Sequence, residues 1–334
     1  MDRKIIIQKC NFNNIYFLLY FVITFVKEII QLDNYLEDWD EQHSEQNQNY
    51  VLPYQILILY ISNISDFIAL IPLFIKNKIL NKKNRIEDKN LNEQSNKTNE
   101  TSELIYNNID IMESKKRKKT VVIFSFLVAL FDFLGEFMVI FFSLLFNNGN
   151  YETYDFSFEI PLQIIFQFIA DYIILKIYFY KLQYFSFFLT LIIFIIILII
   201  DIINVSLFNS FDAKIFLFSP FNLILICLEY SFGKKVMLNG YLSIYLLFVI
   251  KGLIKLIFTF LFSSILIIKD INTFEQLSFF FSEIKYIFLI IGNIIIEFFV
   301  NLFIWLIIDR YNPNYGPLAI ILEGVSYLIM KGIY

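Results

Sequence analysis

The chain has 334 residues, of which 58% are hydrophobic, and its 41 Phe and mean hydropathy of +0.63 exclude a soluble globular protein of this size. The formal net charge of −4 says little about partners, because the charges are segregated by loop. Two cysteines, Cys10 and Cys227, and a single histidine, His43, support neither a disulfide framework nor a metal site. Composition therefore predicts an all-α, polytopic integral membrane protein without a cofactor.

Apolar runs of about 20 residues predict about nine membrane-spanning helices. These runs cover residues 15–31, 51–75, 120–146, 159–178, 184–207, 214–232, 239–267, 285–308 and 315–333. The spans and the polar segments between them give five regions. They are an N-terminal segment (1–14), helices 1 and 2 (15–75), a long polar loop (76–119), helices 3 to 5 (120–208) and a second half with helices 6 to 9 (209–334).

The charges of the loops predict the orientation. The 76–119 loop contains twelve Lys or Arg against seven Asp or Glu, whereas the 32–50 loop contains six acids and no Lys or Arg. Cytoplasmic loops carry the excess of Lys and Arg. We therefore expect the N-terminus and the 76–119 loop to be cytoplasmic, and the 32–50 loop and the C-terminus to lie on the far side. The polar composition of the 76–119 loop predicts that much of it is disordered.

A sequence echo indicates an internal repeat. Pro161-Leu-Gln-Ile-Ile in the fourth span returns as Pro317-Leu-Ala-Ile-Ile in the ninth. A Gly and a Glu precede each copy, namely Gly135 and Glu136 in the third span and Gly292 and Glu297 in the eighth. Because an offset of five spans is odd, the two copies have opposite orientations, as in many secondary transporters. We therefore expect two inverted-topology halves, in which 120–178 superposes on 285–333.

Local motifs in the third and sixth spans fit the same architecture. Ala129-Leu-Phe-Asp-Phe-Leu-Gly135 is similar to the third helix, and Leu228-Glu-Tyr-Ser-Phe-Gly-Lys-Lys235 to the end of the sixth helix, of the solute carrier family 35 (F-type) branch of the drug/metabolite transporter superfamily. This resemblance implies a multi-pass protein that transports by alternating access, and we expect it in an endomembrane compartment. The chain departs from that pattern in having only nine Gly, and it ends at Tyr334, where a tenth helix would follow.

Polar residues inside the spans predict the functional site, because an ionisable side chain at the membrane centre costs about 2.5–3.5 kcal/mol and usually faces the bundle interior. Spacings of four residues place several of them on single helix faces. We expect one cavity lined by Asp132, Glu136, Gln163, Gln167, Lys251, Lys255, Asn293 and Glu297. One lysine should pair with Glu136 or Glu297 and leave the other for the solute. Since a lysine suits a phosphate or carboxylate, the expected solute is anionic.

A structural interpretation of the same residues stays open. The charges and amides would then hold helices together as Lys–Glu pairs and interhelical hydrogen bonds. Three further acids lie near span ends and are expected at the membrane interface, namely Asp66, Asp201 and Glu229, and Trp305 is expected to pack or to lie in an aromatic belt.

Two functions follow from these interpretations. The first is a secondary transporter for a small polar, anionic solute, and the second is a non-transporting structural or regulatory membrane protein of the same fold. We expect no enzyme, because the spans hold no His and no nucleophile motif near a base. The expected partners are the lipid bilayer and a small-molecule solute, not nucleic acid, and the sequence leaves the oligomeric state open.

Overall fold

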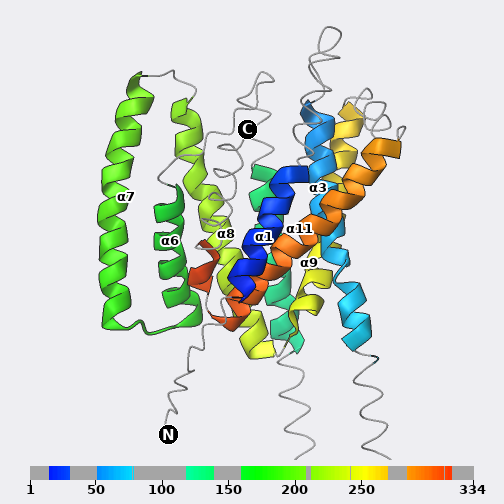
Figure 1. Ribbon diagram of the computed structural model, residues 1–334, viewed down its shortest axis with the longest axis horizontal. Coiled ribbons are helices and arrows are strands. Elements are labelled where there is room, and N and C mark those ends of the chain that lie inside the picture. Colours follow the sequence, from blue (N-terminus) through cyan, green and yellow to red (C-terminus); the bar gives the residue numbers. More distant parts are fainter. Residues whose placement is uncertain are drawn as a thin grey trace, which may run out of the picture.

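The computed structural model describes residues 15–30, 51–76, 78, 118–138, 159–207, 212–240, 242–269, 284–311 and 313–317. These residues form helices, and no strand occurs among them (Figure 1). The helices are α1 (Ile15–Ile30), α3 (Val51–Phe67), a helix at Lys118–Met138, α6 (Glu159–Ala170), the π-helix η1 (Asp171–Leu175), α7 (Lys181–Leu207), α8 (Asp212–Gly240), α9 (Ile244–Lys269), α11 (Ile284–Arg310) and the 3-10 turn η2 (Pro313–Tyr315).

Five helical stretches are long and apolar enough to cross a membrane, which fits the predicted all-α membrane protein. They are Ile56–Lys76, Lys118–Met138, Lys181–Ile200, Ile244–Ile265 and Ile287–Arg310. The count of nine spans and the two inverted halves stay predictions. The N-terminal segment, the 32–50 loop, most of the 76–119 loop and the ninth span beyond residue 317 lie outside the described residues.

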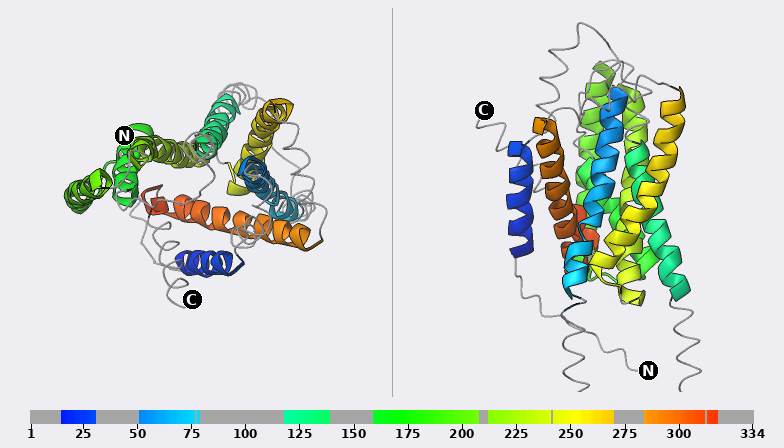
Figure 2. Two further views of the ribbon diagram at one scale, coloured as in Figure 1. Left: turned by 90° about the horizontal axis from the view of Figure 1, so that it is seen from above. Right: turned by 90° about the vertical axis from the view of Figure 1, so that its right-hand side faces the viewer.

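The helices lie side by side, with α7 at one edge of the bundle (Figures 1 and 2). Seen from above, α11 runs along one side with α1 on its outer face, while α3, α9 and the 118–138 helix lie on the other side of α11 (Figure 2). Residue contacts agree with this view, because α1 packs on α11, α3 on both α9 and α11, and α6 on α8. Aromatic rings of the 118–138 helix contact both α8 and α9, through Phe131 with Phe232 and Phe133 with Phe258.

The edge helix α7 is the most exposed of the membrane-length helices. None of its candidate membrane segment is buried inside the protein, although that segment is the most hydrophobic of the five. It contacts α6 on one side, where the rings of Phe168 and Phe187 stack with centroids 4.6 Å apart. A helix that is apolar all round needs an apolar surrounding on every face. Lipid chains would supply it for most of α7.

A close approach between α3 and α9 is made possible by glycine. A Cβ atom added to Gly252 on α9 would lie 2.8 Å from Cβ of Asp66 and 3.2 Å from the backbone oxygen of Asn63. Side-chain hydrogen bonds continue the α3–α9 contact toward the C-terminal end of α9, Asn63 to Thr259 at 2.7 Å and Tyr60 to Ser263 at 2.8 Å. Few glycines occur in the chain, but this one lies where two helices nearly touch, as small residues do in membrane bundles.

The substitution Gly252→Ala should therefore destabilise the protein. The added methyl would meet a Cβ atom and a backbone oxygen, neither of which can rotate away, and overpacking of this kind costs about 1–3 kcal/mol. Gly292→Ala on α11 is the matched control, because nothing lies within 4 Å of the added atom. Thermal unfolding of the purified variants in detergent would measure both. A melting temperature for Gly252→Ala at or above that of Gly292→Ala would contradict the α3–α9 contact.

Candidate functional site

Two lysines of α9 lie at the centre of a buried charge cluster. Lys251 and Lys255 are one helical turn apart, so they share a face of α9, and their side chains are only 4% and 1% exposed. That face turns toward α3, the 118–138 helix and α8, each of which provides at least one carboxylate. An ammonium group deep in a bundle needs such partners, because burial of an unpaired charge is far more costly than burial of a pair.

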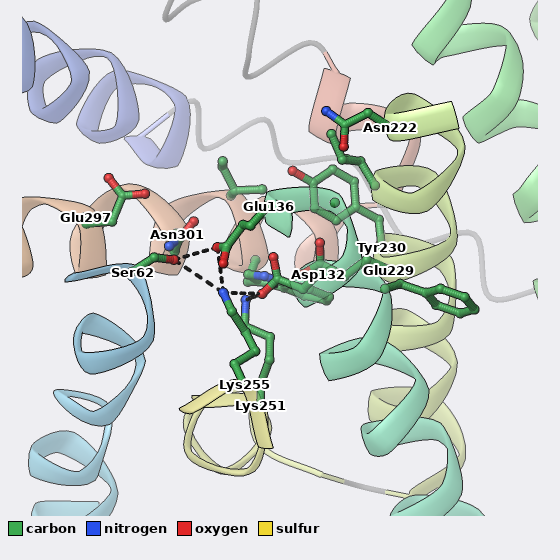
Figure 3. Close-up of a pocket in the computed structure, with 15 residues that line it drawn as sticks. Ser62, Asp132, Glu136, Asn222, Glu229, Tyr230, Lys251, Lys255, Glu297 and Asn301 are labelled. Carbon is green, nitrogen blue, oxygen red and sulfur yellow. Dashed lines mark hydrogen bonds and ion pairs between the residues drawn. The ribbon is translucent and has the colours of Figure 1, made fainter. Parts of the chain in front are cut away.

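Lys255 binds two carboxylates of the 118–138 helix. Its Nζ lies 2.6 Å from Oε1 of Glu136 and 2.8 Å from Oδ2 of Asp132 (Figure 3). Ser62 of α3 joins this group, since its hydroxyl donates to Oε1 of Glu136 at 2.6 Å and accepts from Lys255 at 3.3 Å. The predicted pairing of a lysine with Glu136 is confirmed.

Lys251 binds carboxylates from three different helices. Its Nζ lies 2.9 Å from Asp132, 3.4 Å from Glu229 of α8 and 3.7 Å from Asp66 of α3. The same ammonium group lies 5.9 Å from the centroid of the Trp305 ring on α11, within the range of a cation–π interaction. The expectation that this second lysine is left free for a solute is therefore wrong, because three carboxylates already surround it.

A cavity of about 220 Å³ opens beside the two lysines. Five elements form its walls, namely α3, the 118–138 helix, α8, α9 and α11. Its polar lining includes Ser62, Asp132, Glu136, Asn222, Glu229, Lys251, Lys255, Glu297 and Asn301, and rings of Phe131, Tyr230 and Trp305 form much of the rest (Figure 3). The arrangement can hold a small molecule between charged groups and aromatic faces.

Five of the eight predicted site residues line this cavity, namely Asp132, Glu136, Lys251, Lys255 and Glu297. Glu297 also forms an ion pair of 3.6 Å with Lys27 of α1. Asn293 does not line the cavity, and its side chain donates to the backbone oxygen of Leu289 in its own helix at 3.0 Å. Glu297 therefore lines the cavity, whereas Asn293, one turn earlier on α11, forms a hydrogen bond within its own helix.

The remaining two predicted residues, Gln163 and Gln167, belong to a second polar cluster between α6 and α8. Gln167 donates to Asp171 at 2.9 Å and to Ser231 at 2.8 Å, and Ser231 donates to Asp171 at 2.7 Å. The backbone oxygen of Gln163 accepts from the thiol of Cys227 at 3.5 Å. The spacing of four residues correctly indicates that Gln163 and Gln167 share one helix face, but that face meets α8 and not the cavity.

Two acids that the sequence placed at the membrane interface lie inside the cluster instead. Asp66 is 1% exposed and Glu229 is 5% exposed, and both bind Lys251. A signal for each was present in the sequence. Asp66 follows Ser62 by four residues, and Glu229 follows Asn222 by seven, so each lies on the same helix face as a residue that lines the cavity.

Trp305 packs in the bundle interior, as one of the two expectations for it stated. It is 2% exposed and forms an edge-on contact with Tyr230, with ring centroids 5.8 Å apart. The side chain of Asp201 lies outside the described residues. The aromatic wall that Trp305 and Tyr230 form was not among the expected site residues.

No protein-family model, curated protein or solved structure matches this chain. Its function has to be inferred from the cavity itself.

The charge cluster predicts an order of stability among variants of Lys255 and Glu136. Lys255→Met would leave Glu136 and Asp132, which are partly buried, without their nearest ammonium group, and removal of one partner from a buried pair costs up to about 3–5 kcal/mol. The double variant Lys255→Met/Glu136→Gln removes one of the stranded charges, so it should recover part of the loss. Melting temperatures in lipid nanodiscs would test this order. If the double variant is less stable than Lys255→Met alone, Glu136 does not depend on Lys255 for its compensation.

Proposed function

We propose that this chain is a secondary transporter that binds a small polar solute in the cavity beside Lys251 and Lys255 and moves it by alternating access. The observation that carries the proposal is a cavity inside a bundle of membrane-length helices, walled by five elements, of which four contribute charged side chains. Ionisable residues inside membrane proteins mark substrate or ion pathways in most cases. A site assembled from many helices can also change shape when those helices move.

The contacts of Lys251 with three carboxylates support a moving site. Lys251 lies between 2.9 and 3.7 Å from three carboxylates on three helices, so a small helix shift changes which of them it binds most closely. Such a set of alternative pairs allows two arrangements of similar energy, which alternating access requires.

The two inverted halves belong to this proposal. Glu136 on the 118–138 helix and Glu297 on α11 both line the cavity, and these are the two helices that the sequence echo relates to each other (Figure 3). In inverted-repeat transporters the substrate site lies at the interface of the repeats. We accordingly propose nine spans related to the solute carrier family 35 (F-type) architecture, with a cytoplasmic N-terminus and an endomembrane location.

A structural role without transport is the second candidate, and one observation favours it. The lysines pair with acids at distances as short as 2.6 Å and tie α9 to three other helices. Such pairs would hold a bundle together whether or not a solute enters. The two candidates differ in whether the cavity has to remain open.

A substitution that fills the cavity tests this difference. Gly135→Leu places a side chain into the cavity, where the nearest atom to the added Cβ is the Asn222 amide oxygen at 3.1 Å. Gly292→Leu adds the same side chain where nothing lies within 4 Å. In proteoliposomes screened against a panel of amines, sugars, nucleosides and carboxylates, the unsubstituted protein and Gly292→Leu should take up the same solute. Gly135→Leu should reduce that uptake at least tenfold.

Melting temperatures of the two variants provide the control for folding. Equal uptake by Gly135→Leu and Gly292→Leu, with both variants folded, would show that the solute does not pass through this cavity. No uptake of any solute class by the unsubstituted protein would leave the structural role as the better account.

A further inference from the structure

We infer that the solute of this cavity is a small organic cation, a protonated amine with an apolar body. This inference rests on the proposed function and replaces the anionic solute that the two lysines suggested. Four features carry it, namely the charge balance of the cluster, the pairing of its lysines, its unused acceptors and the aromatic wall.

The charges around the cavity do not balance. Among the described residues, four carboxylates and two ammonium groups form one ion-pair network, which gives a formal charge of −2 when all are ionised. The carboxylates are Asp66, Asp132, Glu136 and Glu229, and the ammonium groups are Lys251 and Lys255. The separate pair of Glu297 with Lys27 adds no net charge. In a low-dielectric bundle such an excess favours uptake of positive charge, as protons or as an organic cation, and opposes entry of an anion.

The lysines offer little to an anion. Lys255 is held by two carboxylates at 2.6 and 2.8 Å, and Lys251 by three at 2.9 to 3.7 Å. An incoming carboxylate or phosphate would have to displace one of these acids and leave it buried without a partner. Entry of a cation has the opposite effect, because the cation gives a partner to one of the carboxylates in excess.

Unused acceptors remain at the cluster. Neither carboxylate oxygen of Asp66, which is 1% exposed and lies beside the cavity lining, accepts a hydrogen bond within the described part of the chain, and its nearest cation is Lys251 at 3.7 Å. Oε2 of Glu136 and the amide oxygen of Asn222 are also buried there without hydrogen-bond partners, and both residues line the cavity. A protonated amine brings N–H donors and no acceptor, which matches the unused oxygens of Glu136 and Asn222 in the cavity.

Aromatic rings line the same cavity as the acids. Trp305 and Tyr230 stand edge to face with centroids 5.8 Å apart, and Phe131 lines the cavity with them. The ammonium group of Lys251 already lies 5.9 Å from the Trp305 centroid, so this ring accepts a cation in the protein as it stands. Rings and carboxylates together suit an ammonium group attached to an apolar body.

Three ligands of one shape and different charge test the inference. Benzylamine, benzyl alcohol and benzoate would be added at equal concentration and constant ionic strength to the full-length protein in nanodiscs at pH 7.4. Binding would be followed by calorimetry and by the melting temperature. Benzylamine should bind and raise the melting temperature, while benzyl alcohol and benzoate should not.

Variants locate the binding site. Glu229→Gln and Glu297→Gln should each weaken benzylamine binding about tenfold or more, since each loses one charged contact. Asp309→Asn is the control, because Asp309 is half exposed, pairs with Lys234 and does not line the cavity. It should leave benzylamine binding unchanged.

Binding of benzoate in preference to benzylamine, equal binding of all three ligands, or no binding of benzylamine at millimolar concentration would each overturn the inference. Benzylamine binding that is insensitive to both glutamate variants would overturn it as well. Uptake separates this result from the proposed function. Cavity-dependent uptake of anions would keep the transporter and remove the cation, whereas selective benzylamine binding without uptake of any solute would keep the cation site and remove transport.

Discussion

The arrangement of this bundle depends on the burial of two ammonium groups on α9. Lys251 and Lys255 have almost no contact with the surroundings of the protein, so the compensation of their charge has to come from neighbouring helices. Carboxylates of α3, the 118–138 helix and α8 provide it, at distances from 2.6 to 3.7 Å. Because removal of one partner leaves a buried charge uncompensated, the positions of these four helices are linked through one cluster.

Packing and electrostatics meet at adjacent residues of α9. Gly252 lets α3 approach so closely that an added Cβ would lie 2.8 Å from Cβ of Asp66, and Lys251, the preceding residue, pairs with that same aspartate at 3.7 Å. A larger residue in place of Gly252 would push α3 away and lengthen the longest pair of the cluster. The close helix contact is thus a condition for the third carboxylate of Lys251, and not only a matter of shape.

The sequence could predict helices and helix faces, but not which neighbour a face meets. The spacing of four residues correctly placed Lys251 with Lys255 and Asp132 with Glu136, because the period of a helix is local. It could not show that Gln167 faces Ser231 of α8, since that contact depends on tertiary packing. The burial of Glu229 was predicted wrongly because the end of its helix was predicted too early. Glu229 lay near the end of the predicted span at 214–232, whereas α8 continues to Gly240, so this acid lies well inside its helix.

The unequal lengths of the contacts separate the ion pairs between α9 and the 118–138 helix from the polar cluster between α6 and α8. Lys255 joins α9 to the 118–138 helix through pairs of 2.6 and 2.8 Å, while Ser231 joins α8 to the Gln167–Asp171 group of α6 and η1 at 2.7 to 2.8 Å. The Lys251–Glu229 contact of 3.4 Å connects these two parts and is longer than any of those. Glu229 also lines the cavity, so a cation that binds it competes with Lys251. Occupancy of the cavity by the proposed cation would then loosen the charged link between α9 and α8 and leave the shorter pairs intact, which would couple solute binding to helix movement in the proposed transporter.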